Sequence, residues 1–181
     1  AEIDFDFDAA VKDYASAFDW IKSVDPSLAA KYKTYEADAL QAIGNYRGDQ
    51  QAMSRAIAAY EMALSLAGRD ANAVQWSKTS NNLANVYLRI GERNLETLPL
   101  EKAIGLYRDV LSVSGGTAAA RATTLSNLGI ALHTLAQRRN DTAIYAEAEG
   151  AFADALALRD KSTDATGWAL DTLNAANLDL A

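Results

Sequence analysis

The sequence predicts an all-α protein, a right-handed solenoid of antiparallel helix pairs with about eight helices, and two observations support this fold class. First, four segments share one pattern, in which a small residue is followed four positions later by an aromatic residue. They are AVKDYASAF at 10–18, AIAAYEMAL at 56–64, AIGLYRDVL at 103–111 and AEGAFADAL at 148–156. Second, these segments start 46, 47 and 45 residues apart. The spacing within a segment defines one face of a helix, and the near-constant step indicates stacked repeats rather than a single closed core.

The longer stretches between these segments have a helical periodicity of their own. Apolar residues recur at intervals of three and four, as in Leu83, Val86, Tyr87 and Ile90. These stretches supply the first helix of each pair, and the repeated segments supply the second. In chain order, the expected helices span residues 8–22, 27–46, 50–67, 73–92, 98–113, 118–138, 143–159 and 165–180.

Capping and turn residues mark the boundaries of these helices. Asp25 and Pro26 fit an N-cap followed by proline at the first helical position, and Pro99 lies near the start of another helix, where its missing N–H costs little. Further expected N-caps are Asp49, Thr117 and Asp141. The glycines expected at helix C-termini and turns are Gly44, Gly48, Gly91, Gly115 and Gly116.

Composition bounds the class of protein. Half of the 181 residues are apolar and 23% are charged, which suffices for a core and a soluble surface. No apolar run approaches the ~18 residues that span a bilayer, so we expect no membrane insertion. Cysteine is absent, which excludes disulfides and thiolate sites. The net charge of -7 argues against nucleic acid as a partner, because phosphate binding depends on Lys and Arg.

We expect a single domain over residues 1–181. Because the chain begins with Ala1 rather than Met, we expect a processed product or an excised fragment. The sequence leaves the compartment open; we favour the cytoplasm, with the periplasm as the alternative. Stacked repeats normally need capping ends, so the unpaired terminal helices suggest a longer array or contacts with partners. The expected parts are a second helix at 8–22, pairs at 27–67, 73–113 and 118–159, and a terminal first helix at 165–180.

The paired segments resemble the tetratricopeptide repeat family, whose pattern is Leu-Gly-x-x-Tyr in the first helix and Ala-x-x-x-Phe in the second. The matching positions are Leu83-Ala84-x-x-Tyr87 with Ala103-x-x-x-Tyr107, and Leu128-Gly129-x-x-Leu132 with Ala148-x-x-x-Phe152. The openings NNLA at 81–84 and SNLG at 126–129 are similar to the longer repeats of the kinesin light chain subclass. Two features depart from the family pattern: the step exceeds ~34 residues, and the closing proline is missing.

A polar stripe follows the first helices. Lys78, Asn82, Asn85 and Arg89 are spaced by four, three and four residues, so they share one helix face. In tetratricopeptide arrays the first helices line the concave surface, so the resemblance implies that such stripes form a peptide-binding groove. The resulting candidate binding residues are Lys31, Tyr35, Asp38, Lys78, Asn82, Asn85, Arg89, Asn127, Ile130, His133 and Asn174.

Within this stripe, Asn82, Asn127 and Asn174 would form a ladder. An amide both donates and accepts, so it can bind the backbone of an extended peptide whatever its side chains. The resemblance supports this role, because kinesin light chains and the repeat domain of O-linked N-acetylglucosamine transferase use asparagines in this way. The alternative is that these amides bind the neighbouring repeat and hold the stack together. The expected groove contains Lys31, Lys78, Arg89 and His133 against Asp38, so it is expected to be less acidic than the rest of the chain and to suit an acidic or neutral peptide.

The sequence shows no cluster of catalytic or metal-binding residues. His133 is the only histidine, so neither a metal site based on several histidines nor a dyad of two imidazoles can form. We therefore expect a non-catalytic module without cofactor or metal, a scaffold or adaptor for a protein or an extended peptide. The alternatives are a regulatory or substrate-recruiting domain of a larger enzyme, and self-association into a homo-oligomer through the terminal helices.

Three other features have ordinary structural interpretations. Asp4, Asp6 and Asp8 lack the glycine and glutamate of a calcium loop, so we expect an acidic helix entrance whose aromatic neighbours pack on the first pair. The SGGT segment at 114–117 lacks the lysine of a phosphate loop and is expected to be a turn. The tryptophans Trp20, Trp76 and Trp168 are either binding anchors or, as we expect, seals between repeats.

Overall fold

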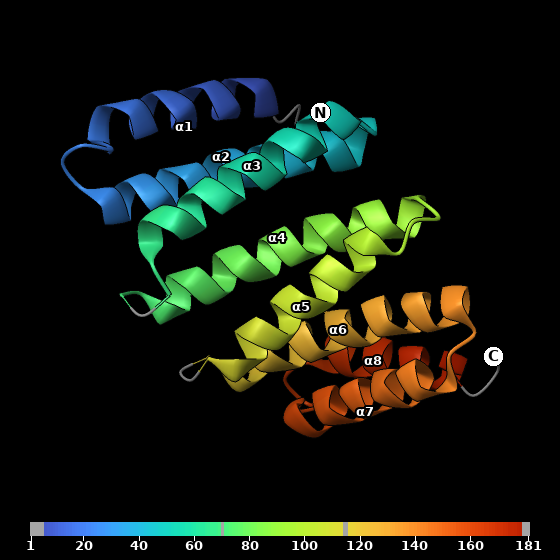
Figure 1. The fold of residues 1–181 in the computed structure, drawn as a ribbon. Coiled ribbons are helices and arrows are strands. Elements are labelled where there is room, and N and C mark those ends of the chain that lie inside the picture. The colour runs from blue at the N-terminus through green and yellow to red at the C-terminus, as the bar shows by residue number, and fades with distance from the viewer. Residues whose placement is uncertain (1–5, 70, 114–115, 179–181) are drawn as a thin grey trace, which may run out of the picture. The chain divides into compact units, whose positions relative to one another are not determined.

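A computed structural model of the chain describes residues 6–69, 71–113 and 116–178, and every helix lies where the sequence predicts it (Figure 1). Each helix end that can be compared agrees with the prediction to within one residue; residues 179–180 of the last predicted helix lie outside the described part. No strand occurs in the described ranges. The helices are α1 (Phe7–Ile21), α2 (Pro26–Arg47), α3 (Gln50–Ala67), α4 (Ala73–Arg93), α5 (Leu98–Ser112), α6 (Ala118–Arg139), α7 (Thr142–Leu158) and α8 (Ala165–Leu178).

The predicted N-caps are confirmed. Asp25 accepts a hydrogen bond from the Leu28 amide at 2.9 Å, and Asp49 accepts from the amides of Gln51 and Ala52. Thr117 and Asp141 cap α6 and α7 in the same manner. Because each side chain satisfies an amide that the first helical turn leaves open, the helix starts are fixed by local sequence.

Two of the predicted glycine turns are wrong. Gly44 and Gly91 lie inside α2 and α4, where each allows a close approach of the following helix. A Cβ atom on Gly44 would lie 2.6 Å from Cγ of Met53, and one on Gly91 would lie 2.5 Å from Cδ2 of Leu100. By contrast, Gly48 ends α2 with a φ of 68°, a left-handed conformation that favours glycine.

The acidic entrance of α1 is confirmed for the described residues, whereas Asp4 and Phe5 lie outside them. Asp6 caps α1 by accepting from the Ala9 amide at 2.9 Å, and Asp8 forms an ion pair with Arg47 of α2 at 2.7 Å. The ring of Phe7 stacks on that of Tyr46, with centroids 5.8 Å apart. These two contacts hold the start of α1 against the C-terminal end of α2.

The chain divides into two compact units, residues 1–86 and 87–181, with the boundary inside α4. In unit 1, α2 packs against α1 and α3, and the N-terminal part of α4 bonds to α2. In unit 2, α6 packs against α5 and α7, and α8 packs against α7 and α6. The organisation as a single domain stays a prediction, and each unit is described by itself.

The two units repeat the same local arrangement with a spacing of 92 residues. Gly48 and Asn140 both end a first helix in the left-handed conformation, with φ values of 68° and 50°. Immediately after them, Asp49 and Asp141 cap α3 and α7, each by bonding two backbone amides. Helices α2 and α3 of unit 1 therefore correspond to α6 and α7 of unit 2, and the start of α4 corresponds to α8.

Aromatic residues of the second helices form the centre of each unit's core. Tyr60 of α3 is 0% exposed and Phe152 of α7 is 1% exposed. Gly129 of α6 makes room for the Phe152 ring, since a Cβ atom there would lie 2.6 Å from Cε1 of that ring. The small and aromatic positions of the sequence pattern are therefore packing partners.

Candidate functional site

In unit 1, the two predicted polar stripes lie side by side along α2 and α4. The Thr34 and Thr79 hydroxyl oxygens are 3.1 Å apart, and the Asn82 amide donates to Asp38 Oδ1 at 2.9 Å. Both contacts advance in the same direction along the two helices, so α2 and α4 run parallel. The structure thus brings Asp38 and Asn82 together.

A directed chain of hydrogen bonds joins the two helices below this surface. The Thr34 hydroxyl donates to the Ala30 carbonyl at 3.0 Å, so Thr79 must donate to Thr34. The Gln75 amide in turn donates to Thr79 at 3.3 Å. Thr34 and Thr79 are 5% and 1% exposed, so this is a buried polar seam that fixes the register of α4 on α2.

Asp38 is the centre of a second network, which reaches into the core. The Tyr60 hydroxyl donates to Asp38 Oδ1 at 2.5 Å and lies 2.7 Å from the side-chain oxygen of Gln41. A hydroxyl has only one proton to donate. With that proton on Asp38, the Tyr60 oxygen accepts from Gln41, whose side-chain NH2 group then points toward it. Burial raises the pKa of Asp38, against the opposing effect of the hydrogen bonds from Tyr60 and Asn82. Burial, followed by the charge of Asp38, raises the pKa of Tyr60.

Asn82 therefore has a structural role, since it satisfies a half-buried carboxylate of the neighbouring first helix. This agrees with the stack-holding interpretation of that residue. The peptide-binding ladder of Asn82, Asn127 and Asn174 stays a prediction, because Asn82 belongs to unit 1 and the other two to unit 2, and each unit is described by itself.

Three residues of the predicted stripe face solvent on unit 1. Lys31 and Tyr35 of α2 and Lys78 of α4 are exposed, and the Lys31 ammonium lies 5.8 Å from the centroid of the Tyr35 ring. Since Tyr35 and Lys78 directly adjoin the paired residues Thr34 and Thr79, they lie on neighbouring parts of the parallel helices. We call Lys31, Tyr35 and Lys78 the cationic patch.

In unit 2, Arg89 is exposed and forms an ion pair with Glu92 at 2.9 Å. Asn127, Ile130 and His133 lie on α6, and all three are partly buried, as is Asn174 of α8. The structure thus places three predicted site residues on one helix, α6.

His133 has an unusual environment. Its ring contacts that of Tyr145, with centroids 5.7 Å apart, and burial lowers the pKa of the imidazole. The Nε2 atom is buried and has no hydrogen-bond partner. The equivalence of the units explains why Nε2 has no partner. His133 has the position of Gln41, and Phe152 has the position of Tyr60 but lacks the hydroxyl that hydrogen-bonds to that position in unit 1.

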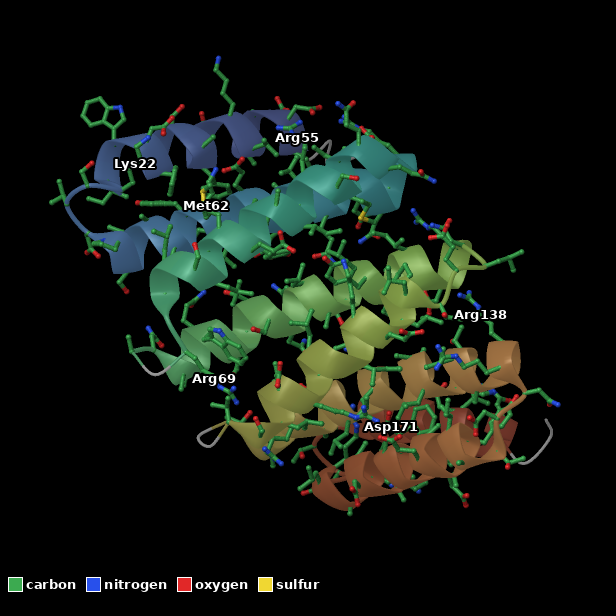
Figure 2. The ribbon with its side chains drawn as sticks, viewed as in Figure 1. Lys22, Arg55, Met62, Arg69, Arg138 and Asp171 are labelled. Atoms are coloured by element: carbon green, nitrogen blue, oxygen red, sulfur yellow. The ribbon has the colours of Figure 1, made fainter. Side chains whose placement is uncertain are left out.

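Sequence reasoning missed a buried ion cluster that holds α8. Arg159, which ends α7, donates from Nε to Asp171 of α8 at 2.5 Å and also binds Asp164 and the Ser126 hydroxyl. Asp171 is 1% exposed, and its side chain points into unit 2 (Figure 2). The available signal was a single carboxylate in an otherwise uncharged helix, ATGWALDTLNAANL.

A second arginine, Arg138 near the end of α6, binds the end of α4 in the same unit (Figure 2). Its guanidinium donates to the Gly91 carbonyl and to the Glu96 carbonyl, the latter at 2.8 Å. Gly91 lies in the last turn of α4, where helix carbonyls lack a helical partner and a cation is favourable, whereas Glu96 lies in the connection to α5.

The tryptophan prediction is wrong for one of the three residues. Trp20 is 88% exposed at the end of α1 and seals no joint. Trp76 and Trp168 are partly buried, and each lies under a cation, Arg69 at 5.0 Å and Lys161 at 4.2 Å from the ring centroid. These two pairs occupy equivalent positions in the two units.

Within the described ranges, no three His, Cys, Asp or Glu side chains form a group able to hold a metal ion. The same residues include no helix that is both long and apolar enough to cross a membrane. Of the SGGT segment, residues 114–115 lie outside the description, while Thr117 is the N-cap of α6.

Comparison with known proteins bears on the fold. No protein-family model and no curated protein matches the sequence. The crystal structure of BtubC (BKLC) from P. vanneervenii is similar in fold, with a TM-score of 0.59 and 18% sequence identity over 97% of this chain and 74% of that chain. BtubC is a helical-repeat protein. The all-α repeat fold predicted from the sequence is thereby confirmed.

Proposed function

We propose that this chain is a non-catalytic interaction module of the tetratricopeptide type, which binds a peptide or a segment of another protein on its first helices. The observation that carries this proposal is the cationic patch, which presents two ammonium groups and an aromatic ring on neighbouring helices. The similarity to BtubC, a kinesin light chain-like repeat protein, supports the choice of repeat type.

The chemistry of the patch favours an acidic segment. Lys31 and Lys78 are exposed, whereas the nearest stripe carboxylate, Asp38, is engaged by Tyr60 and Asn82. The net charge of the chain is -7, so an anionic partner meets less repulsion at a local pair of lysines than the overall charge would suggest. Tyr35 adds apolar area beside the ammonium groups, and such aromatic side chains are common anchors of interfaces.

Selection from a displayed peptide library on the 181-residue chain tests the proposal. We expect selected peptides to be enriched in Asp and Glu, and Lys31→Glu or Lys78→Glu to weaken their binding at least about tenfold. Both residues are exposed, so the melting temperature should stay unchanged.

The matched control is Arg55→Glu, which makes the same charge change at an exposed position of α3, outside the stripe (Figure 2). Equal weakening by Arg55→Glu would show a general charge effect rather than a site. Failure to select any peptide that responds to Lys31 and Lys78 would reject the proposed surface.

A further inference from the structure

The carboxylate of Asp38 has one oxygen that the fold does not use. Its hydrogen bonds from Tyr60 at 2.5 Å and from Asn82 at 2.9 Å both end on Oδ1. Oδ2 accepts from no residue that the structure describes, and this atom is not buried. Burial of the side chain raises the pKa of Asp38 although both bonds oppose the rise. The charged form therefore lacks part of the hydrogen bonding that it has in water, and a further donor at Oδ2 would stabilise it.

Helix packing does not require a carboxylate at this position. In unit 2 the equivalent residue of α6, 92 positions later, is Ile130, and Phe152 has the place of Tyr60. Helix α6 nevertheless packs against α7 and α8, as α2 packs against α3 and bonds to α4. A half-bonded carboxylate that the repeat can do without is a departure of the kind that marks functional positions.

Asp38 continues the line of the cationic patch. Lys31, Tyr35 and Asp38 are spaced by four and three residues on one side of α2, and none of them is buried. On α4, Asn82 follows Lys78 by four residues and bonds to Asp38. Seven helical residues rise about 10 Å, and an extended peptide covers the same distance in about three residues. One peptide along the parallel helices can therefore meet both the lysines and Asp38.

We propose that Asp38 determines the specificity of this surface by accepting, through Oδ2, a hydrogen bond from a lysine or arginine of the bound segment. The inference rests on the proposed function, in which an acidic residue of the segment meets Lys31 and Lys78. The cation of the segment lies about three residues from that acidic residue. A cation is favoured over a neutral donor, because hydrogen bonds between charged groups are the stronger ones. The partner is thus a segment of mixed charge rather than a uniformly acidic one.

The variant Asp38→Asn tests this role with little change in side-chain shape. Tyr60 and Asn82 both donate toward Oδ1, so an asparagine keeps these bonds only with its oxygen in that place. Its NH2 group then lies where Oδ2 was, and an acceptor is replaced by a donor. A second variant, Asp38→Ile, introduces the residue that unit 2 has at this position and offers neither donor nor acceptor.

The assay measures the affinity of peptides selected on the unchanged chain, with each peptide residue replaced in turn by alanine. One lysine or arginine should stand out, and its replacement should weaken binding about tenfold. On Asp38→Asn and Asp38→Ile the same replacement should change the affinity less than about twofold. A new selection on Asp38→Asn should enrich Asp or Glu at that peptide position, because the surface there now donates. The alanine scan on the unchanged chain needs no protein variant.

The matched control is Asp13→Asn, which makes the same change at an exposed position of α1, outside the stripe. It should leave the preference for a cation unchanged, and circular dichroism should show equal helix content in all variants. Peptides that depend on Lys31 and Lys78 but show no preference for a cation would overturn this inference and leave the proposed function standing. A preference that survives both Asp38 variants would do the same. Peptides that respond to neither lysine would reject the proposed function and this inference with it.

Discussion

Replacing Tyr60 by Phe removes one hydroxyl from the Asp38 network and should destabilise unit 1 by about 2–3 kcal/mol. Tyr60 is 0% exposed, and its hydroxyl donates to a carboxylate at 2.5 Å. A hydrogen bond to a charged group contributes about 1.5–3 kcal/mol to stability. Removal of the Tyr60 hydroxyl also leaves the Gln41 side chain without this hydrogen-bond partner. For a chain of this length, the melting temperature should fall by about 4–12 °C.

The assay is urea unfolding followed by circular dichroism, with hydrogen exchange to locate the loss in α2 and the first half of α4. The matched control is Tyr46→Phe, because Tyr46 of α2, the helix that carries Asp38, is 81% exposed and removal of its hydroxyl should change stability little. Because the Tyr60 bond lowers the pKa of Asp38, the destabilisation should be larger at pH 7 than at pH 4. A change below about 0.5 kcal/mol at pH 7 would refute the reasoning that the network stabilises the unit.

Three further predictions follow from the same contacts. Phe152→Tyr should stabilise unit 2 by about 0.5–1.5 kcal/mol by bonding the orphan Nε2 atom of His133, and the gain should vanish when His133 is also replaced by Leu. Asp38→Asn should flatten the pH dependence of stability. The pKa of Asp38 is raised in the folded state, so the native protein binds more protons than the unfolded chain. The wild type should therefore lose stability relative to the variant as the pH rises from about 4 through the folded pKa. Thermal melts of both proteins at several pH values check this, and parallel curves would contradict it. Asp171→Ala should lower the free energy of unfolding by about 3–5 kcal/mol, because it leaves the Arg159 guanidinium buried without its main partner. Hydrogen exchange in α8 should become faster. The control is Asp160→Ala, which removes a carboxylate at an exposed site.

Local patterns explain why the helices could be predicted so closely. The apolar spacing is a property of each segment alone, and a cap such as Asp49 needs only the amides two and three residues ahead. Such signals do not depend on the neighbours a helix will meet. The element order was therefore readable from the sequence.

Features that depend on a neighbouring helix were not predictable. In the sequence, Gly44 resembles a glycine that ends a helix. It lies inside α2 instead, because the Met53 side chain of α3 packs so closely that a Cβ atom would not fit. Asn82 has the spacing of a ligand-binding residue, yet its partner Asp38 lies 44 positions away on a parallel helix. Trp20 belongs to a residue type that is usually buried, and only the packing of α1 shows that nothing within unit 1 covers it.

The equivalence of the two units separates what the fold requires from what each site can vary. The caps Asp49 and Asp141 and the aromatic residues Tyr60 and Phe152 occupy the same places, so they define the helix pair itself. The positions beside the aromatic ring differ between the units: Asp38 of α2 corresponds to Ile130 of α6, which is apolar. Unit 1 therefore joins its first helices through Asp38 and Asn82, whereas unit 2 joins them through Arg159, which binds Ser126 of α6 and Asp171 of α8. Since that change leaves the backbone arrangement intact, the surface of the first helices can change its chemistry without loss of the fold.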